Sequence, residues 1–182
     1  MSAAPREWPL IFAAHSIRAI REGRKTQTRR VLARANALLD GRRPAPGEWE
    51  TLDLPSALAA GRVTPRWRPG DLVWIKEGFV RAGGVYVYRE GEGREGGEAL
   101  RWNSPLFMPR EACRTVLAVV DVRIERLEDI GESDAEAEGA PEPPYREGFR
   151  AMWDRLNAGR GFGWDTNPWV AVLDFRLVPC QT

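Results

Sequence analysis

The sequence is poor in cysteine and histidine, the side chains that bind zinc most often in proteins. It contains two cysteines and one histidine among 182 residues. Cys113 and Cys180 form no CxxC pair, so no zinc-ligand spacing exists. This excludes the zinc-dependent nucleobase deaminases, whose signature includes both a histidine and a CxxC pair. Because the N-terminus has no secretory pattern, both cysteines are predicted to be free thiols in the cytoplasm.

Long apolar runs are also missing, as is a large excess of charge. No segment approaches the roughly 20 apolar residues that span a bilayer, so no membrane partner is expected. The formal net charge is only +1, so any affinity for nucleic acid must come from a local cluster of cations. No GK[ST] sequence exists. The GxGxxG pattern at 91–96 contains glutamates and opens no helix, so no dinucleotide site is predicted there.

Apolar and aromatic residues are well represented. The hydrophobic fraction of 43% is enough for one core, and the length fits a single domain. There are eight tryptophans. Some are expected in the core, but aromatic faces are also how proteins stack on nucleobases.

The pattern of short elements predicts an α+β fold, a small mixed or antiparallel β-barrel with short helices at its ends. An amphipathic helix is expected to end near Asn157, and Ser133–Glu136 has the spacing of a capping box before another short helix. The segment 33–66 is predicted to be a surface insertion and 89–99 a flexible hairpin loop. Strands are expected at 8–12, 72–76, 85–88, 100–103, 115–124 and 169–177, with a first helix at 16–23.

The octapeptide Gly23–Arg30 follows that first helix and contains four cations and two threonines. The leading glycine suits a helix C-terminus, which favours a shaped loop over an exposed helical face. Within it, Lys25 and Thr28 are a candidate catalytic pair. A threonine hydroxyl becomes a nucleophile when a base accepts its proton, and a lysine whose pKa is depressed can be that base. The alternative is a loop that binds phosphate or solvent.

Geometry sets a condition for this pair. Side chains three residues apart on a regular strand point to opposite faces, so Lys25 and Thr28 can act together only if a turn or bulge separates them. Two further candidates are Glu138, which has no evident structural task before Gly139, and Glu77 at the end of the 72–76 strand. For Glu138 the alternative is ordinary exposure to solvent, and Glu77 is expected on the face of its strand opposite Trp74. His15 is given no catalytic role.

Several of these segments together resemble an ASCH domain, a family of PUA-like β-barrels associated with RNA binding and recognition of modified bases. The resemblance covers most of the chain except 33–66 and the glycine-rich loop. The segments that carry it are GRKTQTRR at 23–30, PGDLVWIKE at 69–77, FMPR at 107–110, SDAEAEG at 133–139 and GWDTNPW at 163–169.

The resemblance also implies an activity. One branch of the family comprises small amidohydrolases that remove the acyl group from N4-acetylcytidine and related N4-acylated cytosines. In that branch a threonine is the nucleophile, a lysine activates it and a glutamate is their acid/base partner; the matching positions are Thr28, Lys25 and Glu138. Other members are proposed as ribonucleases or as readers of modified nucleic acid.

The leading hypothesis from the sequence is therefore a cofactor-free amidohydrolase acting on a small N4-acylated cytidine. Trp74 or another aromatic residue of the pocket is expected to stack on the pyrimidine, and Arg24 or backbone amides to hold the oxyanion. Arg29 and Glu77 are further predicted substrate-binding residues. The rival hypothesis is a non-catalytic binder of RNA or modified DNA. In it, Arg24, Arg29, Arg30 and the arginines between 42 and 68 form one positive face.

Overall fold

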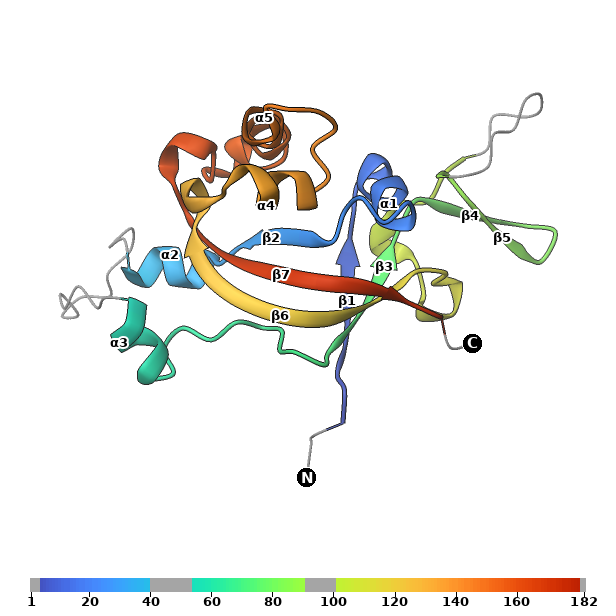
Figure 1. The fold of residues 1–182 in the computed structure, drawn as a ribbon. Coiled ribbons are helices and arrows are strands. Elements are labelled where there is room, and N and C mark those ends of the chain that lie inside the picture. Colours follow the sequence, from blue (N-terminus) through green and yellow to red (C-terminus); the bar gives the residue numbers. More distant parts are fainter. Residues whose placement is uncertain (1–3, 40–53, 91–100, 181–182) are drawn as a thin grey trace.

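The computed structural model describes residues 4–39, 54–90 and 101–180 (Figure 1). Seven strands, five α-helices and five short 3-10 helices occur among them. The strands are β1 (Glu7–Ile11), β2 (Gln27–Val31), β3 (Leu72–Lys76), β4 (Phe79–Ala82), β5 (Val85–Tyr88), β6 (Val116–Arg126) and β7 (Trp169–Val178). The α-helices are α1 (Ala14–Arg21), α2 (Ala33–Leu39), α3 (Leu54–Ala59), α4 (Glu132–Ala137) and α5 (Tyr145–Asn157). The 3-10 helices are η1 (Pro105–Phe107), η2 (Arg110–Ala112), η3 (Leu127–Asp129), η4 (Ala158–Arg160) and η5 (Trp164–Thr166).

A five-stranded sheet in the order β1-β3-β6-β7-β2 forms the centre of the fold, and β4 pairs with β5 separately. Only the β1–β3 pair is parallel, so the predicted α+β class with a mixed sheet is confirmed. Closure into a barrel is not found among the described residues, because β1 and β2 are the two edges of the sheet. The helix α1 connects these edges, and its Ile17 and Ile20 pack into the main core.

The basic octapeptide is only half a loop. Gly23 has a φ of 74° just after α1, as its predicted position at the helix end requires. From Gln27 onward the chain is the edge strand β2, antiparallel to β7. The loop that precedes this strand is therefore 23–26, and Lys25 lies in it.

The strand β6 differs from its predicted pattern. Strict alternation predicts one apolar face running from Val116 to Ile124, but Leu117 and Val119 are the residues in the main core, and Val120 is exposed. A register shift between Val119 and Asp121 explains the difference, because one extra residue reverses which side chains face inward.

A second core lies on the other side of the sheet. Val170 and Val172 of β7 pack there against α5, through Phe149 and Trp153, so β7 is buried on both faces. In Figure 1, α4 and α5 lie together over the β2–β7 side of the sheet. The predicted end of α5 at Asn157 is confirmed. The Ser133 capping box is not found, because α4 begins at Glu132 and its N-cap is Gly131, two residues before Ser133.

The remaining segments lie at the periphery. Strand β5 matches its prediction, but its partner is β4 on its N-terminal side; Asn103 forms only an isolated bridge with Phe79. The predicted insertion contains α2 and α3, and its part at 40–53 lies outside the described residues, as does the predicted loop at 91–99. No helix in the described parts of the chain is both long and apolar enough to span a bilayer.

Candidate functional site

Backbone hydrogen bonds fix the loop that carries Lys25. The amides of Arg24 and Lys25 both donate to Ala19 O, at 2.9 and 3.0 Å. The next amide, of Thr26, donates to Ala137 O at the end of α4 at 2.9 Å, and Thr26 O accepts from Phe175 N at 2.9 Å. The loop is thus tied to α1, α4 and β7. This holds the Lys25 side chain inside the protein, where 4% of the residue is exposed.

Glu138 ends α4 directly opposite this loop. It is the C-cap residue, and Gly139 follows with a φ of 88°. A Cβ on Gly139 would lie 3.2 Å from Lys25 Cβ and 3.4 Å from Ala19 Cβ, closer than ordinary packing allows. The glycine therefore serves both to reverse the chain and to let α4 approach Lys25.

The two side chains form a buried ion pair. Lys25 Nζ donates to Glu138 Oε2 at 2.6 Å and also to the Glu138 backbone oxygen at 2.6 Å. Glu138, like the lysine, is 4% exposed. A buried ammonium needs such partners, since removing a charge from water costs several kcal/mol. The exposed alternative considered for Glu138 is thereby excluded.

Burial is also the largest influence on the protonation of Lys25. It lowers the pKa of the ammonium group, because the neutral amine is favoured away from water. The carboxylate of Glu138 acts in the opposite direction, and the positive charges of Arg30 and Arg29 lower the pKa further. The net effect is a lysine that loses its proton more readily than an exposed one.

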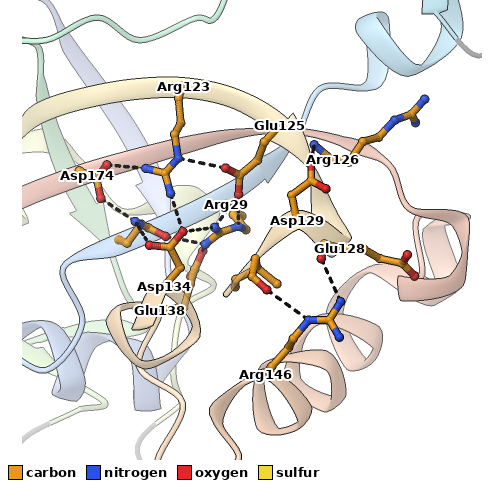
Figure 2. A network of polar contacts seen from close by, with 12 residues as sticks. Arg29, Arg123, Glu125, Arg126, Glu128, Asp129, Asp134, Glu138, Arg146 and Asp174 are labelled. Atoms are coloured by element: carbon orange, nitrogen blue, oxygen red, sulfur yellow. Dashed lines mark hydrogen bonds and ion pairs between the residues drawn. The ribbon is translucent and has the colours of Figure 1, made fainter. Parts of the chain in front are cut away.

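Arg29 connects this pair to a larger polar network (Figure 2). Its side chain is fully buried. The guanidinium donates to Glu138 Oε1 at 3.3 Å and to Glu125 Oε1 at 2.6 Å. It also donates to Gln27 Oε1 at 2.5 Å and to Asp134 Oδ2 at 3.1 Å. Arg29 therefore positions Glu138 from the side opposite Lys25 and is not available as a surface cation.

Thr28 shares a cavity with the ion pair. This cavity has a volume of about 1000 Å³, and Lys25, Thr28 and Glu138 all line it. Because Lys25 precedes the first residue of β2, the alternation that would separate it from Thr28 on a regular strand does not apply. The hydrogen bonds of Lys25 Nζ go to Glu138, so Thr28 lies in the same cavity without being bonded to the pair.

Glu77 also lines the cavity, but its carboxylate already has partners. Arg114 binds it in a bidentate manner, with Nε to Oε1 and Nη2 to Oε2 both at 2.8 Å. Arg21 lies 3.9 Å away. Because Glu77 is only 1% exposed and its carboxylate is already paired, it forms part of the cavity wall and is not a free hydrogen-bond acceptor for a ligand.

Two predicted substrate contacts are placed elsewhere. Trp74 does not line the cavity; it lies on the face of β3 opposite Glu77 and packs in a separate cluster with Phe79. Successive strand residues point to opposite faces, so Trp74 and Glu77 could not both face the cavity from one regular strand. Arg24 is exposed, pairs with Glu22 and does not line the cavity either. The structure therefore places neither Trp74 nor Arg24 at the cavity.

Several residues that line the cavity were not predicted from the sequence as site residues. Trp67, Trp102, Phe149 and Trp153 supply the aromatic walls that Trp74 does not. His15, to which no role was assigned, lines the cavity as well. Burial lowers the pKa of its imidazole, and the charges of Lys25 and Arg155 lower it further, so it is neutral at pH 7. No local pattern links these positions, since they converge only through packing.

The described residues contain no group of three or more His, Cys, Asp or Glu side chains that could hold a metal ion.

Comparisons with known proteins concern the fold. No family model matches the sequence, and no curated protein matches it. Among solved structures, an ASCH domain from Lactobacillus crispatus JV V101 has 11% identity and a TM-score of 0.49, covering 96% of this chain and 81% of the other. The protein EF3133 from Enterococcus faecalis V583, with the family model DUF984, has 15% identity and a TM-score of 0.46, covering 100% and 85%.

One of the solved structures similar to this chain is thus an ASCH domain. That is the family which the sequence motifs resemble. At these identities nothing about activity follows, and the chemistry has to be inferred from the residues of this chain.

Proposed function

We propose that the protein is a cofactor-free amidohydrolase that removes the acyl group from N4-acylated cytosine nucleosides. The observation that carries the proposal is the Lys25–Glu138 pair, buried at the wall of a cavity that Thr28 also lines. Ser–Lys and related hydrolases require a lysine with a depressed pKa within reach of a hydroxyl nucleophile. The motif resemblance to the ASCH amidohydrolases assigns the same three residues.

In the proposed reaction, neutral Lys25 accepts the proton of the Thr28 hydroxyl as Oγ1 attacks the carbonyl carbon of the amide. The tetrahedral intermediate collapses with cleavage of the C–N bond, and the Lys25 ammonium returns the proton to the exocyclic amine of cytosine. Water then attacks the carbonyl carbon of the acyl-threonine ester, and Lys25 accepts a proton from it. The C–Oγ1 bond breaks, Lys25 returns that proton to Thr28 Oγ1, and the carboxylic acid is released. The Lys25–Thr28 hydrogen bond would form on substrate binding, as catalytic hydrogen bonds are often loose in free enzymes.

Glu138 has a positioning and electrostatic role in this scheme. It holds Nζ in place and stabilises the ammonium form that exists after proton transfer. Arg29 holds the other carboxylate oxygen, which limits rotation of Glu138. Stacking on the pyrimidine falls to the aromatic walls, of which Trp102 is only partly buried and therefore accessible.

The rival hypothesis of a nucleic-acid binder is less well supported. It needs Arg24, Arg29 and Arg30 on one positive face, but the Arg29 side chain is fully buried and Arg24 is paired with Glu22. Arg42 and Arg43, also invoked there, lie outside the described residues. A concave cavity with a buried reactive pair at its wall suits a small substrate better than a polymer backbone.

The test is direct. Purified protein incubated with N4-acetylcytidine should release cytidine and acetate in equal amounts, measured by liquid chromatography. Thr28→Val keeps the shape of the side chain without its hydroxyl and should abolish release. Intact nucleoside after prolonged incubation, or a Thr28→Val protein as active as the wild type, would overturn the proposal.

A pH profile tests the role of Lys25 separately. The base is active when neutral, so kcat/KM should rise with pH through the pKa of Lys25, at a midpoint below the ordinary lysine value of 10.5. Glu138 raises that pKa. Glu138→Gln removes this influence and should therefore move the rising limb to lower pH, even if the maximal rate falls. Glu22→Gln, which removes an exposed carboxylate outside the cavity, is the control and should leave the limb in place.

A further inference from the structure

The cavity carries an excess of positive charge. Six cationic side chains line it, namely Lys25, Arg29, Arg30, Arg66, Arg89 and Arg160, against three carboxylates, Glu77, Glu90 and Glu138. Since the whole chain has a net charge of only +1, this excess is local. Such a concentration of one sign in a concave site attracts a ligand of the opposite sign.

The three carboxylates do not neutralise the free arginines. Glu77 is bound by Arg114, Glu90 by Arg18 and Glu138 by Lys25 and Arg29. Among the arginines that line the cavity, four form no ion pair with a carboxylate in the described parts of the chain, namely Arg30, Arg66, Arg89 and Arg160. They differ from Lys25 and Arg29 in having their charge available to a ligand.

Two buried donors at the same cavity also have no partner. Arg30 Nε and Trp67 Nε1 are two of three buried side-chain nitrogens in the described parts of the chain that form no hydrogen bond. Trp67 is 7% exposed, so its indole N–H is shielded from bulk water. An unsatisfied buried donor is energetically unfavourable, and a ligand oxygen that reached it after a small side-chain movement would remove that cost.

The arginine side chains are already oriented. Arg30 lies over the ring of Phe12 at 4.7 Å and donates to Ile11 O at 3.1 Å. Arg66, next to Trp67, lies over the ring of Trp8 at 4.5 Å. These ring contacts restrict the two guanidinium groups, and a planar guanidinium can bind a phosphate in a bidentate manner.

From these observations we infer that the cavity has a phosphate subsite, formed by Arg30, Trp67, Arg66 and Arg160, and that the substrate is a cytosine nucleotide. The inference rests on the proposed function for the identity of the base. The volume of about 1000 Å³ lies at the upper end of the range for small-molecule sites, which leaves room for a sugar phosphate beside the reacting amide.

Equilibrium binding of the reaction products tests this without depending on catalysis. In isothermal titration calorimetry, cytidine 5′-phosphate or 3′-phosphate should bind at least about tenfold more tightly than cytidine, and the preferred isomer shows which hydroxyl carries the phosphate. Equal affinity of both phosphates and cytidine would overturn the inference.

Substitutions with matched controls locate the subsite. Arg160→Gln should weaken nucleotide binding about tenfold and leave cytidine binding unchanged, whereas Arg62→Gln, at an exposed position outside the cavity, should alter neither. Trp67→Phe removes one unpartnered indole N–H and should weaken nucleotide binding. Trp169→Phe removes another that lies outside the cavity and should not. Equal effects of Arg160→Gln and Arg62→Gln would contradict the assignment.

Failure of the two proposals can be told apart. If nucleotides bind more tightly than cytidine but neither N4-acetylcytidine nor its phosphates are hydrolysed, the phosphate subsite stands and the amidohydrolase is wrong. If N4-acetylcytidine is hydrolysed and its phosphates give no higher kcat/KM, the amidohydrolase stands and the phosphate subsite is wrong.

Discussion

Lys25→Met should reduce kcat/KM for N4-acetylcytidine about a thousandfold, within the range that general acid–base catalysis contributes. Methionine fills a similar elongated volume but can neither accept the Thr28 proton nor protonate the leaving amine. The fold should survive, because Glu138 keeps its bond from Arg29 at 3.3 Å. Initial rates under subsaturating substrate measure the effect, with circular dichroism as a check of folding.

The chain offers a matched control, since its only other lysine is Lys76. Lys76 lies over the ring of Trp74 at 5.4 Å, on the face of β3 that does not line the cavity. Lys76→Met should retain wild-type kcat/KM. A Lys25→Met protein with undiminished activity would remove the lysine from the mechanism, and equal losses in both variants would indicate a general effect of removing a lysine.

Arg29→Met should be the most destabilising single substitution in the site, lowering the free energy of unfolding by about 3–5 kcal/mol. The change removes a fully buried guanidinium and leaves the carboxylates of Glu125, Asp134 and Glu138 without it. Each carboxylate keeps one other cationic partner, but Glu138, with only 5% of its side chain exposed, cannot replace the lost guanidinium with water, and this accounts for the size of the effect. Urea unfolding at pH 7 followed by tryptophan fluorescence measures it.

Arg123→Met is the appropriate comparison. Arg123 binds the same Glu125 and Asp134, together with Asp174, but its side chain is 34% exposed, so water can replace it. The decrease in the free energy of unfolding should be clearly smaller for Arg123→Met than for Arg29→Met. Similar losses in the two variants would show that burial does not dominate this network.

The difference in unfolding free energy between the wild type and Arg29→Met should also depend on pH. Burial favours protonation of Asp134, but the hydrogen bond from Gln27 and the charges of Arg123 and Arg29 outweigh it and lower its pKa below the ordinary value of 3.8. A lowered pKa stabilises the folded state above that value, and the contribution is lost as the pH falls through the folded pKa. The difference in unfolding free energy between the wild type and Arg29→Met should therefore decrease under strongly acidic conditions.

Sequence patterns predicted the structure correctly where they depend on a single helix or strand. The strand at 72–76 and the end of the helix at Asn157 follow from alternation and helical periodicity within a few residues. The same patterns gave a wrong prediction where contacts with other parts of the chain determine the local structure. Alternation in β6 is broken by a register shift that depends on its pairing with β7, and Ser133 does not cap α4 although its spacing suits a capping box.

The candidate site shows the same division. The motif around Lys25 and Thr28 and the glutamate before Gly139 could be selected from the sequence because they resemble a family pattern. The alternation of β3 places the side chains of Trp74 and Glu77 on opposite faces, and only Glu77 lines the cavity. His15, Arg160 and Trp67 carry no local signal, because their convergence depends on how α1, η4 and the segment before β3 pack.

The sequence by itself determined the reactive groups, the glycines that reverse the chain beside them and the near-zero net charge that excludes a general polycation. Tertiary structure decided what those groups can do. It brings Lys25 and Glu138, 113 residues apart, to 2.6 Å. It also buries Arg29 while leaving Arg30 without a carboxylate partner among the described residues. The physical reason is that burial, which sets the pKa of a lysine and the availability of an arginine, is a property of the packed chain and not of any segment within it.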